Sequence, residues 1–264
     1  MSNVVKDFRE LLASGNMKEQ DCQDFLERNT ELVYTPFLLN HWIHFGSIIS
    51  KFPLDTSLVT DFAYLTKSSD FWHLVLVELE HPHKKLFRIK SGQIIPTAEL
   101  TAAISQVHSW QDFVRRNGNE VKRRLTSLLK PLESNPIYFK YLLVIGRGDQ
   151  KSKSQSMRDR LASLGNCDFL ICTYDSLISN YSNGPLARKN IIRLTKNRFE
   201  IKHLHCDLYG MLAHLTPEEL IITPKQKEVL IADGYEIGKW EQGIPLKING
   251  KKVKWWGSDK AEPV

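Results

Sequence analysis

The sequence predicts an α/β fold, a mixed sheet flanked by helices, with a small α+β appendage at the C-terminal end. Short apolar runs rich in β-branched residues indicate buried strands. They alternate with segments whose apolar residues recur at three- and four-residue steps, the pattern of amphipathic helices. After two N-terminal helices, these segments follow in the order three strands, helix, strand, helix, strand, which favours a layered domain. A composition of 42% hydrophobic and 25% charged residues in 264 is typical of a globular chain.

Two amphipathic helices are expected first, over residues 3–14 and about 17–28. Gly15 ends the first in the manner of a C-cap glycine. Three strands are expected next, and "PLDT" and "KSSD" between them are turn compositions. They span 44–51, 57–65 and 72–80. Such closely spaced strands predict an antiparallel meander.

The segment 86–95 is expected to form an edge hairpin around Gly92. The longest helical pattern follows, from Thr97 to about Ser127, with a break or kink at Asn117-Gly118. The rest of the α/β core is expected as a strand at 139–147, a helix at about 154–164, a strand at 168–174 and a short helix "DSLISNY".

The last part of the chain mixes proline, glycine and short strand-like runs, including a hairpin across Asn249-Gly250. Its tryptophans fit a small core better than a platform for stacked bases. They are Trp240, Trp255 and Trp256. We therefore expect an N-terminal helix at 1–16, a main domain at 17–184 and a C-terminal subdomain at 185–264.

Composition excludes several classes of protein. No apolar run approaches the ~20 residues of a membrane span. The first residues lack the layout of a signal peptide, so we expect no secretion. Four cysteines without a CxxC pair favour reduced thiols in a cytoplasm over disulfides or zinc knuckles. The histidines of "HPH", His81 and His83, have no third ligand at zinc spacing and fit an exposed turn.

A formal net charge of +6 favours a polyanionic partner, and its distribution is more informative than its sum. Positive residues gather in "RRNGNEVKRR" and "GRGDQKSKSQSMRDR", which could be solvated faces or nucleic-acid contacts. The candidates for contact are Arg115, Arg116, Lys122, Arg123, Arg124 and Arg147. Arg147 could equally pin the edge of the sheet.

The buried strand in "WHLVLVELEHPHKK" ends in Glu78 and Glu80, which lie two apart and so share one side of the strand. Like charges repel in a low-dielectric interior unless a proton or cation separates them. Both could simply end the strand in water. Asp61 on the preceding strand, however, can be a cross-strand neighbour of Glu78. Oxygen ligands on one point suit Mg²⁺ or Mn²⁺, which can activate water against a phosphodiester.

An ordered set of stretches resembles the Shedu (SduA) family, anti-phage defence nucleases of the PD-(D/E)xK superfamily, over roughly residues 17 to 180. The set comprises "EQDCQDFLERNTELV", "TDFAYL", "LVLVELEHPHKKLF", "TAELTAAISQVHSWQDFV", "YLLVIGR" and "DFLICTYDSLI". The resemblance implies a PD-(D/E)xK nuclease-like domain that cuts DNA with a divalent metal, and a homo-oligomer. It also implies a site formed by Asp61, Glu78, Glu80 and Gln106.

The third motif position departs from the usual lysine, because it is Glu80. A carboxylate there could bind a second metal or act as general base, and Lys84 or Lys85 could supply the missing cation. The alternative is a nuclease-like protein that binds nucleic acid or a partner without cutting. Gln106 could orient water or phosphate, or make a structural hydrogen bond. Glu19 could complete the metal shell or face solvent; Glu27 is a further candidate.

Overall fold

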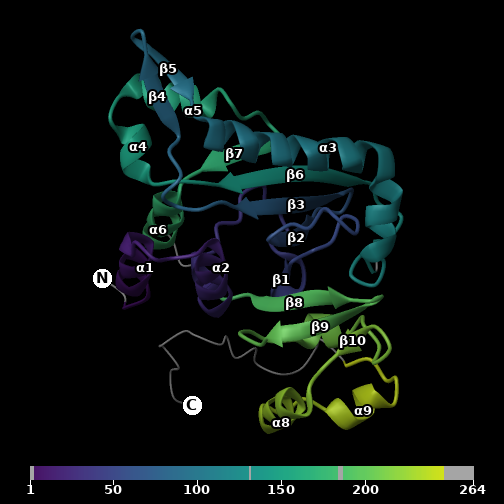
Figure 1. Ribbon diagram of the computed structural model, residues 1–264. Helices are drawn as coiled ribbons and strands as arrows, with labels where there is room; N and C mark the ends of the chain where they lie inside the picture. The colour runs from purple at the N-terminus through teal and green to yellow at the C-terminus, as the bar shows by residue number, and fades with distance from the viewer. Residues whose placement is uncertain (1–2, 131, 184–186, 247–264) are drawn as a thin grey trace.

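The computed structural model describes residues 3–130, 132–183 and 187–246, and its centre is an eight-stranded mixed sheet (Figure 1). The strand order is β10-β9-β8-β1-β2-β3-β6-β7. The strands are β1 (Ser47–Ser50), β2 (Phe62–Lys67), β3 (Trp72–Leu79), β6 (Ile137–Val144), β7 (Phe169–Cys172), β8 (Asn190–Thr195), β9 (Arg198–His203) and β10 (Leu220–Ile221). The predicted mixed sheet flanked by helices is confirmed.

Two helical layers cover the sheet. The bounds are α1 (Asn3–Ala13), α2 (Glu19–Arg28), η1 (Thr30–Leu32), η2 (His44–Gly46), α3 (Ala98–Arg124), α4 (Gly148–Ser152), α5 (Gln155–Ala162), α6 (Tyr174–Asn183), α7 (Tyr209–Leu212), α8 (Pro224–Ala232) and α9 (Ile237–Glu241). Helix α3 runs along β6 and β3 in Figure 1 and shares one apolar core with α5 and α7–α9. Helices α1, α2 and α6 form the second core against the opposite face.

The central strand β3 is buried on both faces. Leu74 and Leu76 belong to the core under α3, whereas Val75 and Val77 belong to the core under α1 and α2. This alternation follows from the two-residue period of a strand. Strand β3 pairs parallel with β6 along its whole length and antiparallel with β2 from Trp72 to Val77, so its last two residues are held by β6.

The predicted antiparallel meander of β1, β2 and β3 is confirmed. Its second strand is shorter than expected, because β2 begins at Phe62 and not at residue 57. The side chain of Asp55 explains the difference. Its Oδ1 accepts hydrogen bonds from the backbone N–H groups of Ser57 and Leu58, each at 2.6 Å, and holds this segment in a turn. Asp61 therefore lies immediately before β2.

Two further local expectations are confirmed. Strands β4 (Phe87–Lys90) and β5 (Gln93–Pro96) form the hairpin around Gly92, as a separate two-stranded sheet. Helix α3 is kinked at Asn117, where φ is −125° and ψ is 21°. The short helix α4, by contrast, was not expected from the sequence.

Residues beyond 187 extend the same sheet. Strand β8 pairs parallel with β1, and β9 and β10 follow it outward. The sheet thus continues across the boundary expected at residue 184, while the three-part division itself stays a prediction. Trp240 is buried and donates its Nε1–H to the carbonyl of Leu215, as expected for a core residue. The hairpin at Asn249-Gly250 and the tryptophans Trp255 and Trp256 lie outside the described residues.

Within the described ranges, no helix has both the length and the apolar character needed to cross a membrane. The cysteines Cys22, Cys167, Cys172 and Cys206 are free thiols.

Candidate functional site

A cluster of carboxylates lies where β2 begins and β3 ends. Asp61 precedes β2, Glu78 is the penultimate residue of β3, and Glu80 follows that strand. Each is about 94% buried, with only 6% of its surface exposed. Together with Glu19 at the start of α2, these residues are called the acid cluster below. Burial of several carboxylates at one place is unusual, because carboxylates stay in water unless they are compensated.

Asp61 is held from two sides. Its Oδ1 lies 2.6 Å from Nζ of Lys51, and its Oδ2 accepts the backbone N–H of Leu79 at 2.7 Å. Its own backbone N–H donates to the carbonyl of Val77 at 3.1 Å. Since Phe62 pairs with Val77, the register extended by one residue sets Asp61 opposite Glu78. The predicted cross-strand relation of these two acids is therefore present.

Glu78 has the largest change in pKa among the acids of the cluster. The amide of Gln106, from the first half of α3, donates to its Oε1. Burial and, to a smaller extent, the negative charges of Asp61, Glu80 and Glu19 together raise the pKa of Glu78 to about 9. Lys51 acts in the opposite direction. At neutral pH and without an added cation, the folded chain holds Glu78 in the protonated form.

Glu80 and Glu19 complete the cluster. The backbone N–H of Glu80 donates to the carbonyl of Val144 at 2.8 Å, which ties it to β6, and its Oε2 accepts a charged hydrogen bond from Lys84. Burial raises the pKa of Glu19, and the charges of Asp61 and Glu80 raise it further. Glu19 is thus within electrostatic reach of the cluster.

Each carboxylate faces its own donor: Lys51 for Asp61, Gln106 for Glu78 and Lys84 for Glu80. Among the residues that the structure describes, no three His, Cys, Asp or Glu side chains are placed so as to hold a metal ion together. The expected convergence of three oxygens on one point is therefore not seen in this arrangement. The donor set itself consists of hard oxygen atoms, the ligands that Mg²⁺ and Mn²⁺ prefer.

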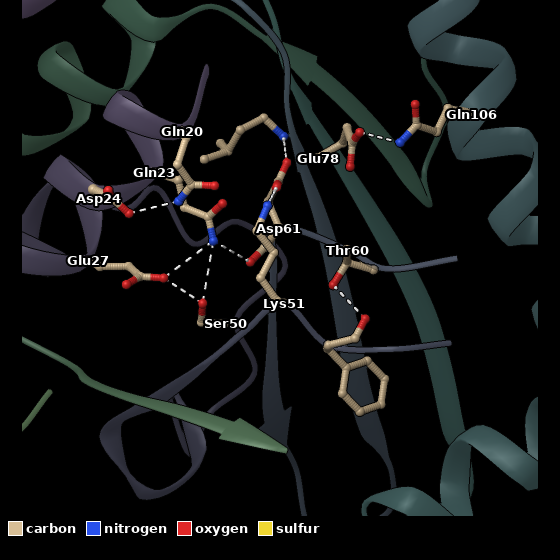
Figure 2. A network of polar contacts seen from close by, with 12 residues as sticks. Gln20, Gln23, Asp24, Glu27, Ser50, Lys51, Thr60, Asp61, Glu78 and Gln106 are labelled. Carbon is tan, nitrogen blue, oxygen red and sulfur yellow. Dashed lines mark hydrogen bonds and ion pairs between the residues drawn. The ribbon is translucent and has the colours of Figure 1, made fainter. Parts of the chain in front are cut away.

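A second polar network adjoins the acid cluster (Figure 2). Nε2 of Gln23 lies within 3.4 Å of the Asp61 carbonyl and of Ser50 Oγ, and 3.3 Å from Glu27 Oε1. The other oxygen of Glu27 pairs with Nζ of Lys202 on β9 at 2.5 Å. The carboxylate of Glu27 therefore binds Ser50 and Lys202. The side-chain amide of Gln23 donates to the backbone carbonyl of Asp61 and so helps to position that residue.

Sequence reasoning missed Gln23 and Lys51. The sequence does contain an indication for Gln23, because Gln23 and Glu27 lie four residues apart on an otherwise apolar face of the helix. The sequence contains no such indication for Lys51, since its contact with Asp61 depends on the irregular segment between β1 and β2.

The basic residues of α3 follow Gln106 along the helix, at increasing distance from the acid cluster. Arg115 lies nine residues and Arg124 eighteen residues after Gln106, which at ~1.5 Å per residue is roughly 14 and 27 Å along the helix without the kink at Asn117. Arg115, Arg116 and Arg123 are exposed, and Arg115 pairs with Asp112 on its own helix. Lys122 and Arg124 are partly buried against backbone carbonyls.

Arg147 serves the fold in this structure. Its guanidinium contacts both carboxylate oxygens of Asp175, at 2.9 and 3.1 Å, and the carbonyl of Leu12 at 3.2 Å. These bonds tie the end of β6 to α6 and α1. His81 and His83 bond in a similar way to the carbonyls of Met17 and Leu12, so they anchor their turn to the segment around α1. His83 is exposed as expected, whereas His81 is partly buried.

Comparison with known proteins bears on the chain as a whole. A comparison with curated proteins found no match. The family model for the C-terminal part of Shedu protein SduA matches residues 16–178, which is more than half of the chain. The matched range contains the entire acid cluster, Gln106 and the strands β1–β3, β6 and β7. The chain therefore belongs to the Shedu SduA family.

Proposed function

We propose that the chain is a metal-dependent DNA endonuclease of the PD-(D/E)xK type, which hydrolyses phosphodiester bonds in anti-phage defence. Membership of the Shedu SduA family supports the defence role. The observation that carries the proposal is the acid cluster, in which burial and three neighbouring negative charges raise the pKa of Glu78 to about 9. Perturbation by burial plus specific charges is characteristic of functional sites.

In this proposal Asp61 and Glu78 would hold Mg²⁺ or Mn²⁺, and Glu80 would complete the shell or act as general base. Glu19 is a further possible ligand. A bound divalent cation would make a water more acidic and stabilise negative charge on a phosphate. Gln106, whose amide faces Glu78, would orient the carboxylate of Glu78 or the attacking water.

The proposed reaction is hydrolysis at phosphorus. The oxygen of a water forms a bond to the phosphorus atom while the bond from phosphorus to one deoxyribose oxygen breaks. The water's proton passes to a carboxylate, for which Glu80 is the candidate, and the leaving oxygen takes a proton from solvent. The backbone bond of Glu80 to Val144 supports this role, because it fixes the base relative to β6.

DNA is the proposed polyanion. Along α3, Arg115 lies nine residues and Arg123 seventeen residues after Gln106, which is roughly 14 and 26 Å at ~1.5 Å per residue. For a duplex that lies along α3, at ~3.4 Å per base pair, these separations correspond to phosphates about four to eight base pairs from the cut. The exposed Arg115, Arg116 and Arg123 are the best placed. The family resemblance implies a homo-oligomer, and the free thiols suit a cytoplasmic protein.

The second candidate is a nuclease-like protein that binds DNA without cutting it. Two observations favour it: Glu80 stands where lysine is usual, and the carboxylates face separate donors among the described residues.

DNA cleavage with and without divalent metal separates the two candidates. The purified chain should nick or cut DNA with Mg²⁺ or Mn²⁺ and stop with chelator. Glu78→Gln keeps the shape of the side chain but removes a charge that the cation needs, so cleavage should fall by orders of magnitude. A parent chain that binds DNA but cuts with neither metal would support the second candidate.

A further inference from the structure

Lys51 contributes a positive charge to the acid cluster from outside the motif. It follows β1 directly, and its Nζ lies 2.6 Å from Oδ1 of Asp61. About 48% of its side chain is exposed, whereas the side chain of Asp61 is only 8% exposed. The ammonium group therefore lies at the boundary between the buried acids and solvent, where a phosphate of DNA would approach.

The charge of Lys51 acts on three of the four acids of the cluster. It lowers the pKa of both Glu78 and Glu19, in addition to pairing with Asp61. Lys84, the other lysine of the site, forms a charged bond with Glu80 and has a less exposed side chain, at 30%. Lys84 also lowers the pKa of Glu19. The difference is that Lys51 lowers the pKa of Glu78 as well and has the more exposed ammonium group.

The backbone of Lys51 is held in an unfavourable conformation. Its φ is 49°, in the left-handed region that side chains other than those of glycine and asparagine rarely adopt. Its N–H donates to the carbonyl of Asp61 at 2.9 Å, and that carbonyl also accepts from Gln23. Strained residues held by surrounding bonds concentrate at functional sites. The strain, the ion pair and the exposure all concern the same residue.

We propose that Lys51 is a catalytic residue, which binds the phosphate at the cleavage position with the ammonium group that Glu80 cannot supply. The inference rests on the proposed endonuclease function. A positive charge there attracts the phosphate before cleavage and stabilises the additional negative charge on its oxygens as the water attacks. The missing lysine of the motif is thus replaced by the residue that follows β1, and not from the loop that contains Lys84 and Lys85.

The test compares Lys51→Met, which keeps length but removes charge, with Lys51→Arg and with Lys84→Met as matched control. Binding to a short linear duplex is measured in chelator at several salt concentrations, so this readout does not depend on metal. Lys51→Met should bind severalfold more weakly at low salt, and the slope of log affinity against log salt should fall in magnitude by about one. Lys51→Arg and Lys84→Met should keep the parent slope.

Cleavage with Mg²⁺ or Mn²⁺ is the second readout. Lys51→Met should cut at least about 100-fold more slowly than the parent, Lys51→Arg should retain partial activity, and Lys84→Met should lose less. Thermal unfolding of each variant checks that it folds, and Lys51→Gln replaces Lys51→Met if the latter does not.

The inference is overturned if Lys51→Met binds and cuts like the parent, or if Lys84→Met alone shows the losses. In either case cleavage abolished by Glu78→Gln would leave the proposed endonuclease intact. A parent chain that never cuts would overturn both proposals.

Discussion

Three carboxylates buried at the ends of two neighbouring strands oppose folding unless something offsets their charge. In this protein each carboxylate accepts a hydrogen bond from a different side chain: Asp61 from Lys51, Glu78 from Gln106 and Glu80 from Lys84. The pKa of Glu78 is nevertheless raised to about 9. With Glu78 ionised as well, the four acids of the cluster would face only two lysines, so the folded chain keeps Glu78 protonated.

Glu78 should make stability fall with increasing pH when no divalent cation is present. Its pKa is about 9 in the folded chain and ordinarily 4.5, so between these values the folded chain keeps a proton that the unfolded chain has released. The contribution is full below pH 4.5 and is lost as pH rises toward 9. Glu78→Gln should flatten this dependence and exceed the parent in stability at pH 8.

Urea unfolding in chelator at several pH values measures this, with Glu133→Gln as the exposed control. Equal pH dependence in the parent and Glu78→Gln would contradict the electrostatic description of the acid cluster.

The positions of the candidate site residues could be predicted from the sequence to different degrees. Asp61, Glu78 and Glu80 could be predicted because two-residue spacing and a short hairpin fix their relation locally. Lys51 could not, because its placement depends on a left-handed backbone position in an irregular segment. The pairing of Glu27 with Lys202 was also inaccessible, since 175 residues separate the partners.

At the scale of elements, the loop after β3 is held tightly against the end of β6. Gly146 follows β6 with φ of 66°, and a Cβ there would lie 2.9 Å from the carbonyl oxygen of Lys84 and 3.0 Å from Leu86 Cδ2. Only glycine allows this approach without displacing the loop. The position of Lys84, and with it the neutralisation of Glu80, therefore depends on Gly146.

Gly146→Ala should destabilise the protein by about 1–3 kcal/mol, because it adds both backbone strain and a steric clash. Gly118→Ala is the matched control. It lies in α3 without a positive φ, and its Cβ would meet only the Phe139 ring, at 3.7 Å. This change should stabilise by about 0.5–1 kcal/mol. Urea unfolding of both variants checks the contrast, and a neutral Gly146→Ala would refute the packing argument.

Most elements of residues 1–183 could be predicted because strand and helix periodicities are local signals. The kink in α3 followed from Asn117-Gly118, and the β4–β5 hairpin followed from turn composition around Gly92. The extent of β2 was wrong by five residues because the bonds of Asp55 to the chain after it compete with strand formation. The participation of β8 in the main sheet could not be predicted, because parallel pairing with β1 joins segments about 140 residues apart in sequence.

At the scale of the whole molecule, β8 determines whether the family-matched part can fold by itself. Strand β1 is covered on one side by β2 and on the other by β8, with Ile48 pairing with Ile191 and Ile49 with Ile192. All four isoleucines are buried. Without β8, β1 becomes an exposed apolar edge, which promotes aggregation.

A chain ended at residue 183 should therefore lose cooperative unfolding and soluble expression. Thermal unfolding followed by circular dichroism, with the full chain as reference, measures this. A cooperative transition in the shortened chain would instead establish the boundary at 184 as that of an independent domain.

The central claim, that the acid cluster is a divalent-cation site, is tested most directly by calorimetric titration of Mn²⁺ into the parent and Glu78→Gln. The parent should show saturable binding that Glu78→Gln loses or weakens at least tenfold, while Glu133→Gln binds like the parent. Protons released from Glu78 on binding should make the measured heat depend on the buffer, because that carboxyl is protonated at neutral pH. No binding in the parent, or undiminished binding in Glu78→Gln, would contradict the account.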